Sequence, residues 1–143
     1  EWRRGGDGFV VATAGCQPVV FDRDGKHLIT FARGDAYATD PARTVGHCAS
    51  VTAVSCHPHD KDIVATASLD GTIRIWDLGH KGKYLFDCLK CDRAYRLKDQ
   101  AGRRTAATAV SWRPDGREIW AGTRCGSVQA WTYARHARAP PSR

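Results

Sequence analysis

Three aromatic residues recur along this chain at a constant spacing. Phe21, Trp76 and Trp131 each lie near the end of a short apolar run, and successive members are 55 residues apart. A fixed period over three units is typical of repeat architectures, in which each unit buries its faces against its neighbours. The runs are β-branched and alternate with polar residues, so we predict an all-β fold for the 143 residues.

The middle unit carries the most complete pattern. It begins at Gly46-His47 and ends at Trp76-Asp77-Leu78, with an acidic Asp70-Gly71 turn between alternating apolar runs. Asp-Gly between two such runs is a strong signal for a tight turn. We predict the strands of this unit over residues 51–56, 62–67, 72–76 and, as a fourth strand, 83–89.

The flanking units show fewer strands. Before the middle unit the strands are expected over residues 9–14, 18–21 and 26–32, and after it over 108–112, 118–122 and 127–133. We therefore divide the chain into a partial unit over 8–45, a complete unit over 46–104, a partial unit over 105–133, and a disordered basic tail over 134–143. The connections Arg33–Val45 and Lys90–Arg104 lengthen the repeat, and loops of that kind often hold partners.

The Gly-His to Trp-Asp unit resembles the WD-repeat superfamily of β-propellers. That resemblance implies a partial, open propeller of about two and a half blades, each a four-stranded antiparallel sheet, because a closed ring needs about 4–8 blades. More narrowly, the order of four features is similar to the family of WD repeat-containing protein 70. These features are Val19–Gly25, Gly34–Asp40, the blade start at Gly46, and Gly126–Trp131.

A histidine, a hydroxyl and an aspartate in the middle unit suggest a hydrolase triad when they are taken in isolation. The resemblance implies another role: the Trp76 N–H meets Thr66, Thr66 meets His47, and His47 meets Asp70 in a structural hydrogen-bond network. At the position of Asp70 the neighbouring units carry other residues, Gly15 and Cys125. At the position of Thr66 they carry Val11 and Ala121.

The six cysteines are scattered through strand-like runs, so we expect reduced thiols in an intracellular protein. Cys88-Leu89-Lys90-Cys91 has the spacing of half a zinc site, but the sequence holds no second pair of that spacing. We therefore favour two thiols at strand ends over a zinc site, and expect no metal and no cofactor.

The basic charge is concentrated in the second half of the chain. Residues 1–79 hold 8 Lys/Arg and 10 Asp/Glu, whereas residues 80–143 hold 14 and 5, for a net charge of +7 overall. A basic segment of this kind attracts nucleic acid or an acidic protein, or is simply solvated. The candidate partner-binding residues are Lys81, Lys83, Lys90, Arg93, Arg96, Lys98, Arg103 and Arg104, with Tyr84 and Tyr95 interleaved.

No P-loop, dinucleotide fingerprint or nucleophile elbow occurs, no apolar run approaches a membrane span, and we expect no enzyme and no small-molecule substrate. We interpret the chain as a non-catalytic scaffold that binds other proteins, with direct nucleic-acid binding through Lys81–Arg104 as the alternative. The resemblance implies a nuclear protein in multiprotein assemblies, linked to a cullin-4 ubiquitin ligase and DNA damage or to splicing. The Trp-Asp-x-Arg box of ligase receptors lacks its arginine here, at Gly79 and at Ala134.

Overall fold

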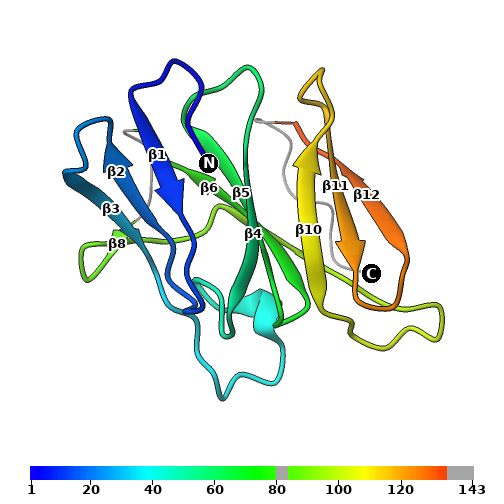
Figure 1. The fold of residues 1–143 in the computed structure, drawn as a ribbon. Coiled ribbons are helices and arrows are strands. Elements are labelled where there is room, and N and C mark those ends of the chain that lie inside the picture. Colours follow the sequence, from blue (N-terminus) through cyan, green and yellow to red (C-terminus); the bar gives the residue numbers. More distant parts are fainter. Residues whose placement is uncertain (80–83, 135–143) are drawn as a thin grey trace.

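Three twisted sheets stand side by side in this computed structural model, which describes residues 1–79 and 84–134 (Figure 1). The first sheet has the order β1-β2-β3-β8-β7, the second β4-β5-β6-β9, and the third β10-β11-β12. All neighbouring strands are antiparallel except β3 and β8, which run parallel. The sheets do not close into a ring, so the architecture is a partial β-propeller.

The strands of the first sheet are β1 (Gly8–Val11), β2 (Val19–Asp22), β3 (His27–Phe31), β8 (Cys88–Leu89) and β7 (Tyr84–Leu85). Those of the second are β4 (Val51–Cys56), β5 (Ile63–Ser68), β6 (Thr72–Asp77) and β9 (Arg93–Arg96). Those of the third are β10 (Ala107–Trp112), β11 (Glu118–Thr123) and β12 (Val128–Thr132). One short 3-10 helix, η1 (Pro41–Arg43), interrupts the connection between β3 and β4.

The aromatic repeat marks equivalent strands, as the sequence predicts. Phe21 is the next-to-last residue of β2, Trp76 of β6 and Trp131 of β12. In the second sheet this strand lies between β5 and β9, and in the first between β1 and β3. The first sheet therefore lacks a strand equivalent to β4, and the third lacks a strand equivalent to β9.

The second sheet is buried on both faces because a neighbouring sheet covers each of them. Every residue of β5 is buried, and so are the first five residues of β6. Ile63 and Ile75 pack toward the third sheet, whereas Val64 and Trp76 pack toward the first. Trp76 stacks on Phe31 of β3 with ring centroids 4.3 Å apart. The strands alternate side-chain direction, so one sheet contributes to two separate cores.

The fourth strand of the second sheet is not where the sequence predicts it. The predicted strand over residues 83–89 is wrong: residues 84–89 form the hairpin β7–β8, which reverses at Phe86 and Asp87, both with positive φ. This hairpin joins the first sheet, whereas β9, which we assigned to the basic connection, completes the second. The pattern misleads because no glycine or asparagine marks the turn and because Leu89 is buried against the first sheet.

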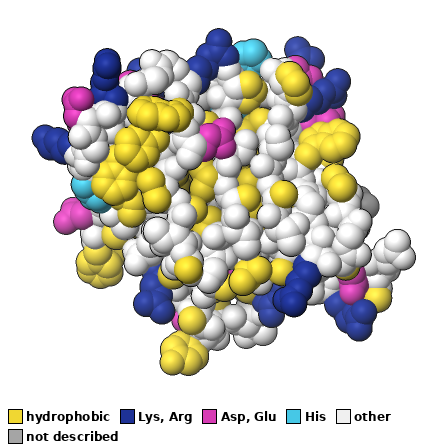
Figure 2. Space-filling view, in the orientation of Figure 1, with side chains coloured by type: hydrophobic (Ala, Val, Ile, Leu, Met, Phe, Trp, Pro, Cys, Tyr) yellow, Lys and Arg dark blue, Asp and Glu magenta, His cyan; other side chains and the backbone are white. Residues whose placement is uncertain are grey.

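The two outermost faces of the assembly carry apolar side chains without a covering sheet. On the first sheet, Trp2, Phe9 and Phe21 form a ladder of rings with centroid separations of 5.0 and 5.6 Å. Figure 2 shows hydrophobic side chains gathered over this sheet, at the left of the view. On the third sheet, Trp120 and Val128 are 48% and 65% exposed. No helix among the described residues is long and apolar enough to cross a membrane.

Candidate functional site

A chain of hydrogen bonds crosses the second sheet. Trp76 Nε1 donates to Thr66 Oγ1 over 2.8 Å, and Thr66 Oγ1 lies 2.6 Å from His47 Nε2. His47 Nδ1 in turn lies 2.9 Å from Asp70 Oδ2. These contacts connect the loop before β4 with β5, β6 and the turn between them. Thr66 and His47 are completely buried, so neither side chain is open to a substrate.

Burial sets the protonation states of this network. Burial lowers the pKa of His47 and outweighs the opposing effect of Asp70. A neutral imidazole with its hydrogen on Nδ1 donates to Asp70 and accepts from Thr66, which satisfies all three groups. Burial alone raises the pKa of Asp70, but hydrogen bonds from His47, Thr72 and the Cys48 N–H lower it to about 2. The aspartate is thus charged and fully engaged.

The predicted basic residues do not share one surface. Arg93 and Arg96 are three residues apart in β9. Because successive side chains of a strand point to opposite faces, these two lie on opposite sides of β9. The Arg93 guanidinium carbon lies 5.3 Å from the centre of the Tyr133 ring, beside the third sheet. Arg96 instead makes a forked ion pair with Asp40 in the connection between β3 and β4, at 3.2 Å from Nε to each oxygen.

The other predicted cations also lie in different parts of the structure. Arg103 pairs with Asp99 inside its own loop, with Nε and Oδ2 3.0 Å apart. Lys90 follows β8, away from that loop in the chain. Lys81 and Lys83 lie outside the described residues. Only Arg96, Lys98 and Arg104 come together, and they do so around one pocket.

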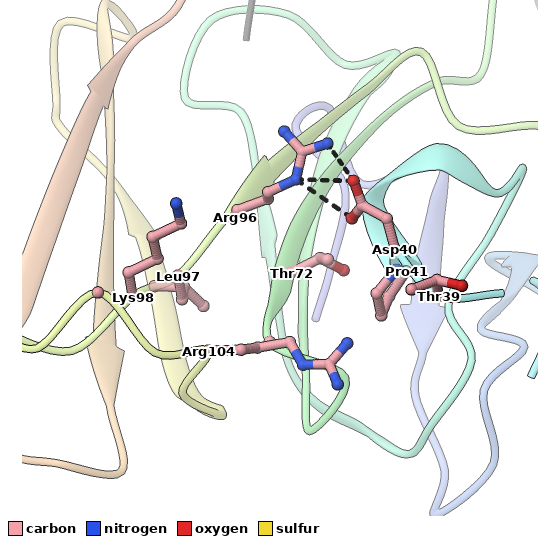
Figure 3. Close-up of a pocket in the computed structure, with 10 residues that line it drawn as sticks. Thr39, Asp40, Pro41, Thr72, Arg96, Leu97, Lys98 and Arg104 are labelled. Carbon is pink, nitrogen blue, oxygen red and sulfur yellow. Dashed lines mark hydrogen bonds and ion pairs between the residues drawn. The ribbon is translucent and has the colours of Figure 1, made fainter. Parts of the chain in front are cut away.

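This pocket, of about 330 Å³, lies between the connection that precedes β4 and the loop that follows β9. Figure 3 shows Arg96 reaching from β9 to Asp40, with Arg104 extending below Thr72. Pro41 and Leu97 are buried and supply an apolar lining. The pocket therefore combines an apolar surface with a rim of cations.

A buried arginine fixes the wall of the pocket. Asp40 caps η1 by accepting from Ala42 N at 3.1 Å. Arg74, completely buried in β6, donates from Nη1 to the Thr44 carbonyl at 2.8 Å and from Nη2 to the Pro41 carbonyl. Buried carbonyl groups need such partners. Arg74 thereby holds both ends of η1 against the sheet, and Asp40 is placed to receive Arg96.

A smaller pocket of about 210 Å³ adjoins the first and shares Pro41 and Arg104 with it. Its other lining includes Ala36, Ala38 and Leu69, which are small or apolar. Asp70 also lines it, but the hydrogen bonds of the buried network already occupy that carboxylate. The two pockets meet at Arg104, one with a rim of cations and the other with small and apolar side chains beside the charged Asp70; we refer to them together as the rim groove.

Sequence reasoning missed Asp40, Pro41 and Arg74 as residues that build this site. Asp40-Pro41 has the pattern of a helix start, an N-cap acid followed by proline, and could have predicted η1. Arg74 carried no such signal, because in an alternating strand its position reads as one open to solvent.

Cys88 and Cys91, the candidate half of a zinc site, have different surroundings. Cys91 Sγ lies 2.8 Å from Arg74 Nη1, and burial raises the pKa of its thiol. Cys88 lies in β8, paired with Thr30 of the first sheet. Within residues 1–79 and 84–134, no group of three or more His, Cys, Asp or Glu side chains is placed to hold a metal ion.

Comparisons with known proteins agree with this geometry. Residues 39–77 match the family model WD domain, G-beta repeat. The gastrulation defective protein 1 homolog of Drosophila melanogaster is 37% identical over 88% of this chain and 18% of its own length. WD repeat-containing protein 70 is 32% identical in Xenopus tropicalis and 30% in Homo sapiens, over 92% of this chain in both. The chain spans about a fifth of the length of these relatives, 18–20%.

A solved structure shares the fold. The β-propeller domain of Cps50 (Swd1) from Myceliophteria thermophila superposes with a TM-score of 0.65 at 14% identity, covering 91% of this chain and 33% of that one. The fold and the sequence agree with these matches. The sheets stand in an open row, and the aromatic residues recur at a fixed spacing, as expected for repeats. Residues 39–77 match a WD repeat, the described chain has the fold of a partial β-propeller, and the sequence is similar to WD repeat-containing protein 70.

Proposed function

We propose that this chain is part of a non-catalytic scaffold that binds a protein partner at the rim groove. The supporting observation is the meeting of two long connections at one pocket, where Arg96, Lys98 and Arg104 surround an apolar lining. Loops held by a rigid scaffold are the usual place for binding residues. Here β4–β6 and the buried Arg74 provide that rigidity.

A catalytic role has less support in this part of the chain. The residues most like a hydrolase triad are His47, Thr66 and Asp70, and each is already saturated with buried hydrogen bonds. WD-repeat folds are scaffolds on which function depends on the surface, so the surface groove is the better candidate. We therefore propose binding without chemistry.

Nucleic-acid binding through residues 81–104 has less support than protein binding. A nucleic-acid track needs cations along one surface and free aromatic faces for stacking. Arg93 and Arg96 diverge from β9, and Tyr95 stacks on Trp131 with centroids 5.6 Å apart. These contacts favour a small, local binding site over a surface that follows a continuous chain of phosphates.

By family resemblance, we propose a nuclear setting in multiprotein assemblies. Such assemblies include those of the DNA-damage response and ubiquitin ligation, and those of splicing. The missing arginine after Trp76-Asp77 and Trp131-Thr132 argues against docking to a ligase adaptor through these two strands.

The test is affinity purification of the tagged full chain from nuclease-treated nuclear extract. The rim variant carries Arg96→Glu and Arg104→Glu, and the control is Arg117→Glu, an exposed cation beyond the turn between β10 and β11. We expect the rim variant to lose a set of proteins that wild type and control retain. An unchanged set of proteins in all three samples would contradict the proposal.

A further inference from the structure

Two cations line the rim groove without an acidic partner among the described residues, and Figure 3 shows Arg104 extending into the groove while the charged end of Lys98 points away from that of Arg104. Lys98 and Arg104 form an isolated antiparallel bridge across the loop that follows β9. Residues directly opposite in such a pair have Cβ atoms about 4.5–5.5 Å apart, and like charges there repel. Within the described residues, no Asp or Glu side chain forms an ion pair with either one.

Two neighbouring cations, by contrast, have acidic partners. Arg103 is paired with Asp99, and Arg96 with Asp40. Gly71 leaves space for the Arg104 side chain, since a Cβ at Gly71 would lie 2.4 Å from Arg104 Cγ. The packing thus directs Arg104 across the turn into the rim groove. An anion bound at the Arg104 guanidinium would use one free charge and be attracted by the second at Lys98.

The groove continues from this cationic end toward a second end of mixed character, where the charged Asp70 lies beside small and apolar side chains. Arg104 lines both pockets, and beyond it lie Ala36, Ala38 and Leu69, the last 48% exposed. Their combined shape offers one position for a charged group and a neighbouring one for an apolar side chain. A free inorganic anion would use only the first position, whereas an extended peptide can use both.

We infer that the rim groove binds an extended peptide segment of a partner protein, with an acidic side chain that pairs with Arg104 near Lys98 and an adjacent apolar side chain against Ala36, Ala38 and Leu69. The inference rests on the proposed scaffold function and specifies its partner. The acidic group is a carboxylate or a phosphate, since both pair with arginine. Asp40 keeps Arg96 in place at the edge of this site and limits the excess positive charge, which suits one anion more than a polyanion.

The experiment starts from the full chain and a displayed library of random peptides. Enriched peptides are synthesised with a fluorescent label and titrated by fluorescence polarisation at about 50 and about 200 mM salt. We expect a consensus with Asp or Glu next to an apolar residue, and weaker binding at the higher salt. A version with phosphoserine in place of the acid distinguishes phosphate from carboxylate as the preferred group.

Variants then locate the site. Lys98→Gln with Arg104→Gln should weaken the acidic peptide on the order of tenfold. The same double variant should leave a peptide with Gln in place of its acid unchanged, which isolates the charge pairing. Ala36→Asp at the second end gives an independent test and should also weaken binding. Arg117→Gln is the matched control, and equal thermal melts show that each variant is folded.

Three results would overturn the inference. One is a consensus without an acid, or no enrichment at all. Another is an acidic peptide whose affinity does not change in the Lys98→Gln, Arg104→Gln variant. The third is tighter binding of a uridine oligonucleotide that this double variant abolishes, which would assign the groove to nucleic acid. If the nuclear-extract test still shows rim-dependent partners, the scaffold function stands although the peptide class is wrong.

Discussion

His47 Nδ1 and Asp70 Oδ2 lie 2.9 Å apart inside the second sheet, although 23 residues separate them in the chain. The contact connects the loop that enters β4 to the turn between β5 and β6. Next to His47, position 46 requires glycine, because a Cβ there would lie only 1.7 Å from the Ala32 carbonyl oxygen. The pair therefore joins the rim connection to the sheet, and its loss should affect both.

Removal of Asp70 should destabilise the protein. In Asp70→Ala, the His47 Nδ1–H, the Cys48 N–H and the Thr72 N–H lose a buried acceptor. Each unsatisfied buried group costs about 1–3 kcal/mol, so with three such groups we expect a loss of at least about 3 kcal/mol in the free energy of unfolding. Chemical denaturation of the full chain measures it, with the exposed Asp115→Ala as control. Equal stability of the two variants would count against a structural role for the network.

Acid should weaken the same network in two steps. The pKa of His47 is lowered in the folded state, so unfolded chains bind more protons below about pH 6.5 and stability falls from there. Asp70 has its pKa lowered to about 2, so its contribution is complete above about pH 4 and is lost as the pH falls toward 2. Melting temperatures from pH 7.5 downward should decrease, and below about pH 4 they should fall less steeply in Asp70→Ala, which lacks the aspartate step. Identical pH profiles for both proteins would rule out this linkage.

Loss of the buried guanidinium should loosen the wall of the rim groove. Arg74→Met fills similar volume but leaves the Pro41 and Thr44 carbonyls without their donor. We expect about 2–3 kcal/mol of destabilisation and faster amide hydrogen exchange over residues 40–45. Arg117→Met, at an exposed position, is the control. Unchanged exchange over 40–45 would show that other contacts are sufficient to hold η1.

The hairpin β7–β8 should fasten the second unit to the first. Leu89 is completely buried with Phe31 and Trp76, whereas Leu85 of the same hairpin is 38% exposed. Leu89→Ala should therefore cost about 2–5 kcal/mol and speed hydrogen exchange in β3 as well as β8. Leu85→Ala should have little effect on either. If β3 stays protected in Leu89→Ala, the parallel pairing of β3 and β8 does not depend on this core contact.

Cys125 should be the most reactive thiol near neutral pH. Hydrogen bonds from Ser127 and Thr123 lower its pKa to about 7, and the residue is exposed. Burial raises the pKa of Cys56 to about 11 and also raises that of Cys91. Because the thiolate is the nucleophile, iodoacetamide at pH 7 should label Cys125 first, as read by peptide mass spectrometry. Faster labelling of Cys56 or Cys91 would show that those thiols are less protected than their burial indicates.

Much of the local structure of this protein can be predicted from its sequence. The strand over Val51–Cys56, the turn at Asp70-Gly71 and the aromatic period of Phe21, Trp76 and Trp131 follow from alternation, turn chemistry and counting. These signals are local, because side-chain direction alternates with every residue of a strand and a tight turn needs only a few residues. They were enough to predict a partial propeller with its most complete unit in the middle.

Which distant segments meet depends on the packing of the whole fold. It placed β8 beside β3, Arg74 beneath the carbonyls of η1, and Lys98 opposite Arg104 at the rim groove. Each of these contacts depends on the packing of whole sheets, since a buried charge or an added strand is stable only where another segment satisfies it. The basic residues therefore read as one segment in the sequence, yet of those that the structure describes the fold brings only three to the pocket.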